Sequence, residues 1–268
     1  MARIIPTAEP FFLPGRGKYA RIGCLVTHGF TSSPKVVRYV GECFNAVGFT
    51  VLGERLTGHA TRPEDMIRSR WQDWLLSLED GYNLLRSQTD QVFLLGLSMG
   101  GALSLVAASR LPSAFGPGEV GVRGVVTMST PYGLPNDGLL RYLNLLSLVR
   151  PYLPKSKEAP GAGWFDKESW RQHVAYPENP VRAISELAAL LRVMRSELPQ
   201  VQVPALLIHS RDDHYVLDGS MDSIFGQLGS KSKQEIWVEG GGHNITIEPT
   251  RDEVFQRSYE FILRVLSQ

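Results

Sequence analysis

The sequence contains little cysteine and has no excess of charge. Cys24 and Cys43 are the only cysteines among 268 residues, and neither lies in a C-x-x-C motif or at a metal-ligand spacing from a histidine. A disulfide scaffold and a zinc site are therefore disfavoured, and we expect no metal. Lys and Arg number 28 against 27 Asp and Glu, a formal net charge of +1. Because such a chain has no global field to attract polyanions, we expect no nucleic-acid partner.

Long uninterrupted apolar runs are also missing. The N-terminus has no charged start followed by an apolar stretch, so we expect no signal peptide and, by default, a cytoplasmic protein. Residues 91–109 carry no charge and are long enough to be mistaken for a membrane span. Because Gly96, Ser98, Gly100 and Gly101 interrupt this stretch, we interpret it as a strand, a turn and a helix, and expect no transmembrane segment.

Short apolar runs alternate with longer amphipathic stretches along most of the chain, which is typical of βαβ units and a parallel sheet. This pattern predicts an α/β fold with a mostly parallel central sheet and helices on both faces. The expected strands are 22–27, 50–53, 92–97, 124–128, 204–209 and 235–239, and the expected helices are 34–47, 69–87, 99–110, 181–197, 220–228 and 251–266.

The alternation stops between Thr130 and Pro180, where prolines and glycines accumulate. We therefore expect a core formed by residues 1–131 and 180–268, with residues 132–179 inserted as a small cap above the sheet. One strongly apolar helix is expected at 136–150. Apolar side chains cover most of its circumference, so it is either a well-covered core helix or a mobile lid that turns its apolar side toward a substrate.

The segment around Ser98 carries the strongest chemical signal. Ser98 stands in Gly96-Leu97-Ser98-Met99-Gly100, directly after an apolar strand and before a helical pattern. A serine raised on a strained strand-to-helix turn leaves no room for side chains beside it, hence the flanking glycines. We expect Ser98 to be a nucleophile. A structural or phosphate-binding glycine turn is the alternative, but the lysine of a phosphate loop is missing.

A nucleophilic serine needs a base and an acid that orients the base. His243 follows the last expected strand in a glycine-rich loop and is the best base among six histidines; His209, inside a strand, suggests a packed core residue. The acid should follow the preceding strand, because open parallel sheets build sites at the carboxyl ends of their strands. Asp213 is favoured there, and Asp212 is the rival that we expect to pair with Arg211 at the surface.

The tetrahedral intermediate of acyl transfer needs two preorganised N–H donors. Met99 supplies one, since its backbone N–H follows the nucleophile. Phe30 is expected to supply the other, because Gly29 lets the chain bend toward the substrate after the strand that ends in Thr27 and His28. A simple tight turn at His28-Gly29 is the alternative.

With these residues assigned, the chain resembles the α/β-hydrolase superfamily, and within it bacterial carboxylesterases and monoacylglycerol lipases. The chain order Ser98, Asp213, His243 is the one that this superfamily uses. Further likenesses are the loop 55–65, Trp71-Gln-Asp-Trp74, Asp213-His-Tyr-Val216 and Gly242-His243-Asn. The resemblance implies the α/β-hydrolase fold, the catalytic roles assigned above, and a cap inserted after the sixth strand of the family fold.

We therefore expect a serine esterase or lipase that forms an acyl-enzyme, needs no cofactor, and cleaves neutral esters with a medium acyl chain or a monoglyceride. The expected substrate pocket comprises Gly29, Leu139, Leu143, Leu146, Val216 and Ile245. A peptidase or thioesterase that uses the same triad is an alternative, although the acidic residues of the insertion show no cluster that would hold a substrate amine. A homologue that only binds an apolar ligand is a further alternative.

Overall fold

The computed structural model describes residues 3–116, 118–135, 140, 142–155 and 163–268. Within these residues, seven strands form one sheet in the order β1-β3-β2-β4-β5-β8-β9. Only the edge strand β1 runs antiparallel to its neighbour, β3. The strands of this sheet are β1 (Phe11–Leu13), β2 (Ile22–Thr27), β3 (Thr50–Gly53), β4 (Gln91–Leu97), β5 (Gly121–Met128), β8 (Ala205–Ser210) and β9 (Lys233–Val238).

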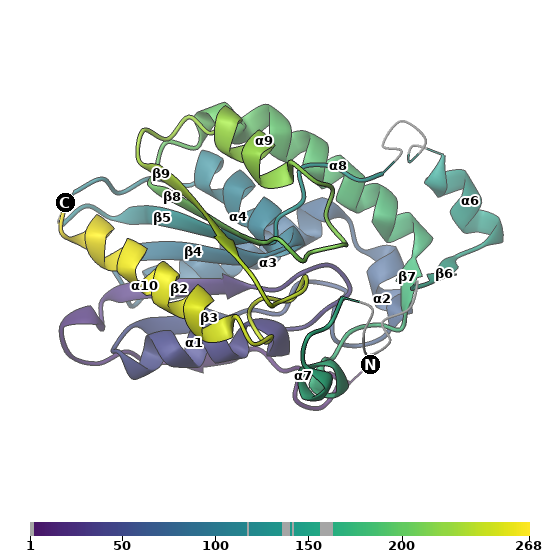
Figure 1. Ribbon diagram of the computed structural model, residues 1–268, viewed down its shortest axis with the longest axis horizontal. Helices are drawn as coiled ribbons and strands as arrows, with labels where there is room; N and C mark the ends of the chain where they lie inside the picture. Colours follow the sequence, from purple (N-terminus) through teal and green to yellow (C-terminus); the bar gives the residue numbers. More distant parts are fainter. Residues whose placement is uncertain (1–2, 117, 136–139, 141, 156–162) are drawn as a thin grey trace.

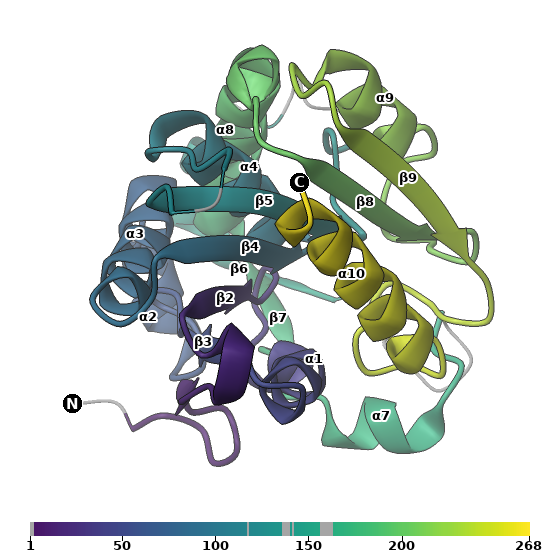
Figure 2. The same ribbon diagram turned by 90° about the vertical axis from the view of Figure 1, so that its left-hand side faces the viewer.

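Helices cover both faces of the sheet, as Figures 1 and 2 show. One face carries α1 (Lys35–Ala46) and α10 (Arg251–Leu266). The other carries α3 (Trp71–Arg86), α4 (Met99–Arg110), α8 (Val181–Glu197) and α9 (Ser220–Gln227). The short helix α2 (Pro63–Arg68) precedes α3, and short 3-10 helices occupy Gly17–Tyr19 and Leu198–Gln200. A mostly parallel sheet between two helical layers confirms the α/β fold class.

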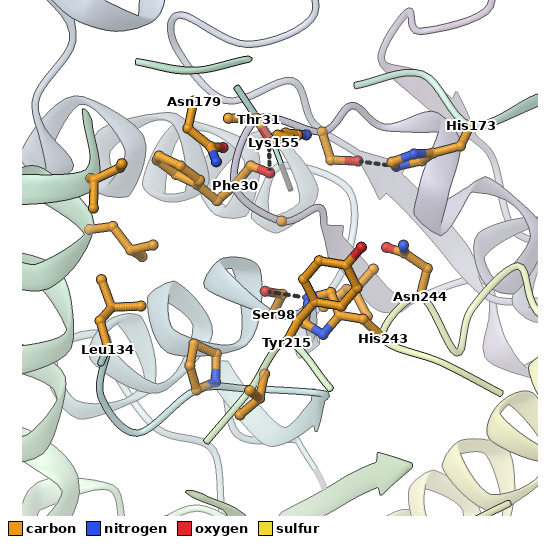
Figure 3. Close-up of a pocket in the computed structure, with 17 residues that line it drawn as sticks. Phe30, Thr31, Ser98, Leu134, Lys155, His173, Asn179, Tyr215, His243 and Asn244 are labelled. Atoms are coloured by element: carbon orange, nitrogen blue, oxygen red, sulfur yellow. Dashed lines mark hydrogen bonds between the residues drawn. The ribbon is translucent and has the colours of Figure 1, made fainter. Parts of the chain in front are cut away.

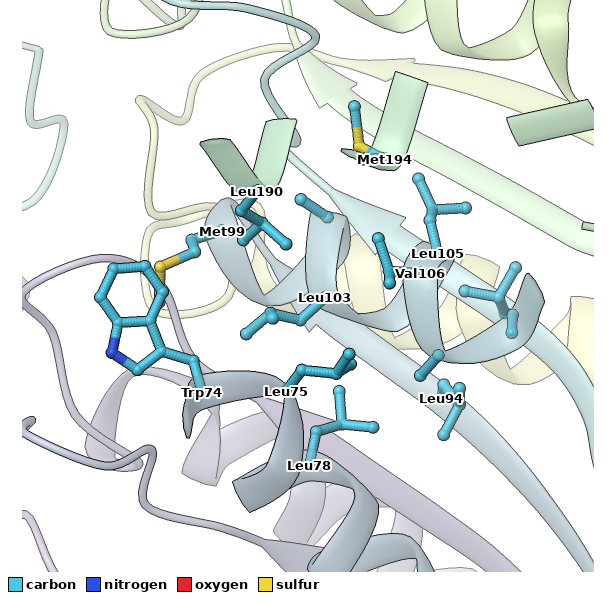
Figure 4. Close-up of a cluster of buried hydrophobic side chains, with 14 of the residues drawn as sticks. Trp74, Leu75, Leu78, Leu94, Met99, Leu103, Leu105, Val106, Leu190 and Met194 are labelled. Atoms are coloured by element: carbon cyan, nitrogen blue, oxygen red, sulfur yellow. The ribbon is translucent and has the colours of Figure 1, made fainter. Parts of the chain in front are cut away.

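Two buried cores hold these layers together, one on each face of the sheet. Figure 4 shows the larger core, where Trp74 and Leu78 of α3 lie beside Leu103 of α4 and Leu190 of α8. Strand β4 is buried along its whole length, because helices cover it on both sides. The uncharged stretch 91–109 is therefore strand β4, a turn and helix α4, and no helix among the described residues is long and apolar enough to cross a membrane.

The predicted elements of the core agree with the structure to within a few residues at each end. The sequence pattern missed β1 and α2. Strand β1 is only three residues long and has one partner strand, so it shows too few residues for an alternating pattern.

The described part of residues 132–179 forms two separate pieces (Figure 1). Helix α6 (Leu143–Val149), followed by the antiparallel pair β6 (Tyr152–Pro154) and β7 (Glu178–Pro180), lies beside α8, whereas α7 (Lys167–Gln172) lies on the side of α1. Residues 136–139 and 141 of the predicted helix 136–150 lie outside the described residues. For the described part of this helix, the prediction of a well-covered core helix is wrong. Leu145, Leu148 and Val149 are 66%, 82% and 86% exposed, because α6 packs on α8 with one side only.

Candidate active site

Ser98 lies at the tight turn between β4 and α4. Its backbone has φ 56° and ψ −119°, a left-handed conformation that non-glycine residues adopt only when their surroundings enforce it. A Cβ atom on Gly96 would overlap the backbone of Gly100, and one on Gly100 would overlap the carbonyl of Thr27. The two glycines therefore permit the close packing that holds Ser98 in this conformation, with its side chain partly exposed above the sheet.

The structure brings Ser98, His243 and Asp213 together at the carboxyl edge of the sheet. His243, from the loop after β9, has its Nε2 3.0 Å from Ser98 Oγ and its Nδ1 2.8 Å from Asp213 Oδ2. Figure 3 shows the imidazole of His243 beside Ser98. Because Ser98 Oγ and His243 Nε2 share one hydrogen bond, the imidazole can take the hydroxyl proton as the oxygen attacks.

Asp213 is almost completely buried in the turn after β8. Burial opposes ionisation of its carboxyl, but the His243 imidazole, the N–H of His209 and the backbone N–H of Tyr215 outweigh burial and hold the pKa of Asp213 well below its usual range. The carboxylate is therefore ionised throughout the neutral range and can fix His243 as the tautomer that carries its proton on Nδ1.

The rival acid makes a different contact. Asp212 Oδ2 accepts a hydrogen bond of 2.8 Å from the backbone N–H of Gly240. The prediction of a surface pair between Asp212 and Arg211 is wrong, because Arg211 pairs with Glu239 instead, with Nε 3.6 Å from Oε1. Asp212 thus ties the turn after β8 to the loop after β9 by a backbone contact, away from the imidazole of His243.

The other histidines have contacts of their own. His28 Nε2 accepts the backbone N–H of Leu56 at 3.2 Å, and burial lowers the pKa of His28 to about 4. His59 is fully buried against Trp74, and His214 is exposed.

His209 is buried, as expected, but its Nε2 lies 3.1 Å from Asp213 Oδ2. This contact was not predicted from the sequence, although the four-residue spacing of the two residues across the end of a strand is compatible with it.

The two expected amide donors flank Ser98. Met99 begins α4, and the first N–H groups of a helix have no acceptor within the helix. Phe30 follows Gly29, where a Cβ atom would stand 3.1 Å from the Cβ of Ser98. The chain before Phe30 thus passes close to Ser98, and the turn is held by the 2.9 Å hydrogen bond from the N–H of Tyr176 to the carbonyl of Thr31.

A cavity of about 300 Å³ opens above Ser98. Its wall is apolar at Leu134 and at the residues of α8, and polar at Thr31, Lys155, His173 and Asn179. The described lining residues are Gly29, Phe30, Thr31, Ser32, Leu97, Ser98, Pro131, Leu134, Lys155, His173, Asn179, Ile184, Leu187, Tyr215, Val216, His243 and Asn244.

The predicted pocket residues are only partly found there. Gly29 and Val216 line the cavity, whereas Ile245 points away from it and is fully buried in the core beneath α1 and α10. Leu187 of α8 and Leu134 form part of the apolar wall and were not predicted from the sequence. The pattern of α8 shows which residues are apolar, but not which of them face a cavity.

The two predicted pocket residues that lie in α6 do not line this cavity. Leu143 and Leu146 are absent from its described lining, and Leu139 lies outside the described residues. Helix α6 packs against α8, where Asn144 Oδ1 accepts a 2.7 Å hydrogen bond from the hydroxyl of Ser185. This contact helps hold the helix on α8, so its apolar side chains do not meet the space above Ser98.

The segment 163–176 is fastened to the core near His243. Glu248, almost fully buried, accepts the backbone N–H groups of Phe165 and Asp166 at 3.0 and 3.2 Å. Ser169 Oγ donates a 2.7 Å bond to the carbonyl of Ile247. Burial raises the pKa of Glu248, which the two N–H groups counteract. Residues 163–169 and the loop that carries His243 therefore form one packed unit.

Sequence comparison finds relatives of known activity. Residues 19–250 match the family described as serine aminopeptidase, S33. The chain is 31% identical over 263 residues to a thermostable monoacylglycerol lipase of Bacillus sp. (strain H-257), covering 97% of this chain and 96% of that protein. It is 28% identical over 259 residues to a carboxylesterase of Bacillus subtilis (strain 168), covering 96% and 97% of the two chains.

Solved structures show the same fold. One, from work on LipS and LipT, two metagenome-derived lipolytic enzymes, has a TM-score of 0.85 and 33% identity, covering 98% of this chain and all of that chain (100%). The monoacylglycerol lipase of Paleococcus ferrophilus has a TM-score of 0.75 at 17% identity, covering 96% and 98%. The second likeness concerns the fold alone.

Proposed function

The chain belongs to the serine aminopeptidase S33 family and has the α/β-hydrolase fold, and we propose that it is a serine esterase or lipase that cleaves neutral, apolar carboxylic esters. Two hydrogen bonds carry the proposal. They run from Ser98 Oγ through His243 to the buried carboxylate of Asp213, at the floor of a partly apolar cavity. The lipase and carboxylesterase activities of the two bacterial relatives support the same reaction class.

In the proposed acylation, Ser98 Oγ attacks the ester carbonyl carbon while its proton passes to His243 Nε2. Asp213 stabilises the imidazolium that forms. The amides of Phe30 and Met99 donate to the oxyanion. The intermediate then collapses, the bond from the carbonyl carbon to the alkoxide oxygen breaks, and the imidazolium gives its proton to the departing alcohol.

Deacylation repeats these steps with water. His243 Nε2 accepts a proton from water as the water oxygen attacks the acyl-enzyme carbonyl, and the same two amides hold the second oxyanion. The bond to Ser98 Oγ breaks, the serine oxygen regains a proton from the imidazolium, and the carboxylic acid leaves. These steps need only groups of this chain and water.

The walls of the cavity support a medium acyl chain or a monoglyceride as substrate. Leu134, Ile184 and Leu187 form an apolar side suited to the acyl chain. Thr31, Asn179 and other polar residues on the opposite side suit a hydroxylated leaving group. We propose that residues 132–179 act as the cap over this site, because β7 and α7 bring Asn179 and His173 to its wall.

The family description includes aminopeptidases, so peptide cleavage is the alternative to test. Recognition of a substrate amine requires a nearby carboxylate. No described residue that lines the cavity is an Asp or a Glu. Turnover of a series of p-nitrophenyl acyl esters compared with aminoacyl amides distinguishes the two activities: we expect ester cleavage, and faster cleavage of amides would overturn the proposal.

Replacing the nucleophile tests the mechanism. We expect Ser98→Ala to lose several orders of magnitude in p-nitrophenyl ester turnover and to lose covalent labelling by a fluorophosphonate probe. Ser87→Ala is a matched control, because Ser87 is exposed after α3 and its hydroxyl donates to the carbonyl of Leu84 in the same turn. Equal turnover by the wild type and Ser98→Ala would refute the mechanism, and a wild type that reacts with neither ester nor probe would indicate a non-catalytic binding protein.

A further inference from the structure

The carboxylate of Asp213 is saturated with hydrogen-bond donors. Oδ1 accepts the backbone N–H groups of Tyr215 and Val216 at 2.8 and 3.3 Å. Oδ2 accepts from His243 Nδ1 at 2.8 Å and from His209 Nε2 at 3.1 Å. An ionised carboxylate has about four lone-pair sites, and all are used here. The side chain of Asp213 is 0% exposed, so these four donors decide where its oxygens point.

His209 differs from the other three donors in where it is anchored. Tyr215 and Val216 belong to the same turn as Asp213 and move with it, and His243 is the base that the carboxylate must orient. His209 lies in β8, which pairs with β5 on one side and β9 on the other. Of the four described donors, it alone belongs to a strand of the sheet.

The ring of His209 is itself held in place. It is buried and packs against Trp237, its register partner in β9, with the two ring centres 5.7 Å apart. The guanidinium of Arg211 covers Trp237 at 4.9 Å. Since a carboxylate only accepts hydrogen bonds, His209 Nε2 must carry the proton. A rigid N–H from the sheet therefore points at the oxygen that His243 also uses.

We propose that His209 is a positioning residue for the proposed triad: its Nε2–H occupies one lone-pair direction of Asp213 Oδ2 and leaves the other aimed at His243 Nδ1. The proposal rests on the ester-hydrolase function proposed above. Without this donor, Oδ2 has no contact with the sheet, and the buried turn can rotate the carboxylate away from His243. The base then loses its orientation, although Ser98, His243 and Asp213 are all still present.

Two substitutions separate the hydrogen bond from the packing. His209→Phe keeps a ring against Trp237 but has no donor, whereas His209→Gln keeps an N–H that can reach Asp213. For a short soluble p-nitrophenyl ester we expect His209→Phe to lower kcat by about 10- to 100-fold with little change in KM. We expect His209→Gln to recover most of that loss. His214→Ala, an exposed histidine of the same turn, should keep the wild-type kcat.

Two further measurements read the orientation itself. The rate at which a fluorophosphonate labels Ser98 should fall in His209→Phe in parallel with kcat, because labelling uses the same base. The far-downfield proton resonance of the His243 Nδ1–H, which reports its bond to Asp213, should move or broaden in His209→Phe and persist in His209→Gln. Circular dichroism and thermal melting establish that each variant is folded.

The outcomes separate this proposal from the function on which it rests. Three results would each overturn the positioning role: an unchanged kcat in folded His209→Phe, equal losses of kcat in His209→Phe and His209→Gln, or an effect confined to KM. If Ser98→Ala is inactive, the proposed triad is still supported in each of these cases. If Ser98→Ala cleaves the ester as fast as the wild type, the proposed function and the role of His209 fall together.

Discussion

The carbonyl oxygen of Gly163 lies against Gly242, directly before His243, so closely that a Cβ atom at residue 242 would overlap it. This contact joins the segment 132–179 to the loop that carries the proposed base. Glu248 strengthens the junction, because its carboxylate binds the N–H groups of Phe165 and Asp166. The position of His243 therefore depends on how residues 163–169 dock on the core.

The first prediction concerns this contact. Gly242→Ala should lower kcat/KM at least about tenfold and destabilise the fold by about 1–3 kcal/mol, because a methyl group must push apart two packed backbones. Ester kinetics and urea unfolding measure the two effects. Gly226→Ala in α9 is the control, since a Cβ atom there meets no neighbour. Wild-type kinetics in Gly242→Ala would show that the segment moves aside without disturbing His243.

The second prediction separates the adjacent carboxylates. Asp213→Asn should lower kcat by about 10⁴-fold, because an amide cannot stabilise the imidazolium and favours the wrong imidazole tautomer. Asp212→Asn removes a negative charge from the next residue but keeps an oxygen that can accept the N–H of Gly240. It should therefore change kcat by less than about threefold. A larger loss of kcat in Asp212→Asn than in Asp213→Asn would show that Asp213 is not the acid of the triad.

The turn that carries Ser98 could be predicted because its determinants are local. Strand, glycines, Ser98 and helix are contiguous in the sequence, and each glycine is required by a backbone only a few residues away or by the neighbouring strand. The places of Asp213 and His243 followed from topology, since the carboxyl ends of parallel strands meet at one edge of the sheet.

The cavity wall and the contact of His209 could not be predicted in the same way. Helix α6 has apolar residues on most sides, so its sequence pattern cannot show which side packs on α8 and which side faces solvent. Leu148, for example, is exposed to solvent. From the sequence, His209 is predicted to be a core histidine, because it lies in an apolar strand. Its role depends on the direction of its Nε2–H, which is set by Trp237 from another strand.

The third prediction compares two glycines inside helices. Gly226 in α9 has open space where a Cβ atom would be, so Gly226→Ala should raise the free energy of unfolding by about 0.5–1 kcal/mol through the lower entropy of the unfolded chain. Gly41 in α1 lies under the ring of Phe11, where a Cβ atom would stand 2.8 Å from Cε2. Gly41→Ala should therefore destabilise the protein. Urea unfolding of both variants measures the difference, and a gain in both would show that the Phe11 ring moves freely.

The fourth prediction concerns a buried carboxyl outside the proposed site. Glu54 follows β3, and its Oε1 accepts a 2.6 Å hydrogen bond from the hydroxyl of Thr27. Its Oε2 is buried and has no hydrogen-bond partner among the described residues. Burial raises the pKa of Glu54 to about 8, which the hydrogen bond from Thr27 only partly offsets. Glu54 is therefore protonated in the folded protein at neutral pH.

This pKa shift makes stability depend on pH in a definite direction. In the unfolded chain Glu54 ionises near its ordinary value of 4.5, whereas in the folded protein it holds its proton up to about pH 8. Between these values the folded state binds more protons than the unfolded state, so stability falls as pH rises, by at most about 1.4 kcal/mol per pH unit from this group. Below pH 4.5 and above pH 8 the group adds no slope.

Glu54→Gln tests the assignment, because an amide has nearly the same shape and never ionises. Urea unfolding of the wild type and Glu54→Gln at pH 5.5, 7.0 and 8.5 should show the variant gaining stability relative to the wild type as pH rises. Asp80→Asn is the control, because Asp80 is exposed on α3 and lines the same surface pocket as Glu54; this variant should follow the wild-type pH dependence. A stability difference between wild type and Glu54→Gln that stays constant across these pH values would mean that Glu54 does not titrate in this range, and that its buried Oε2 is hydrated or ionised in the folded protein.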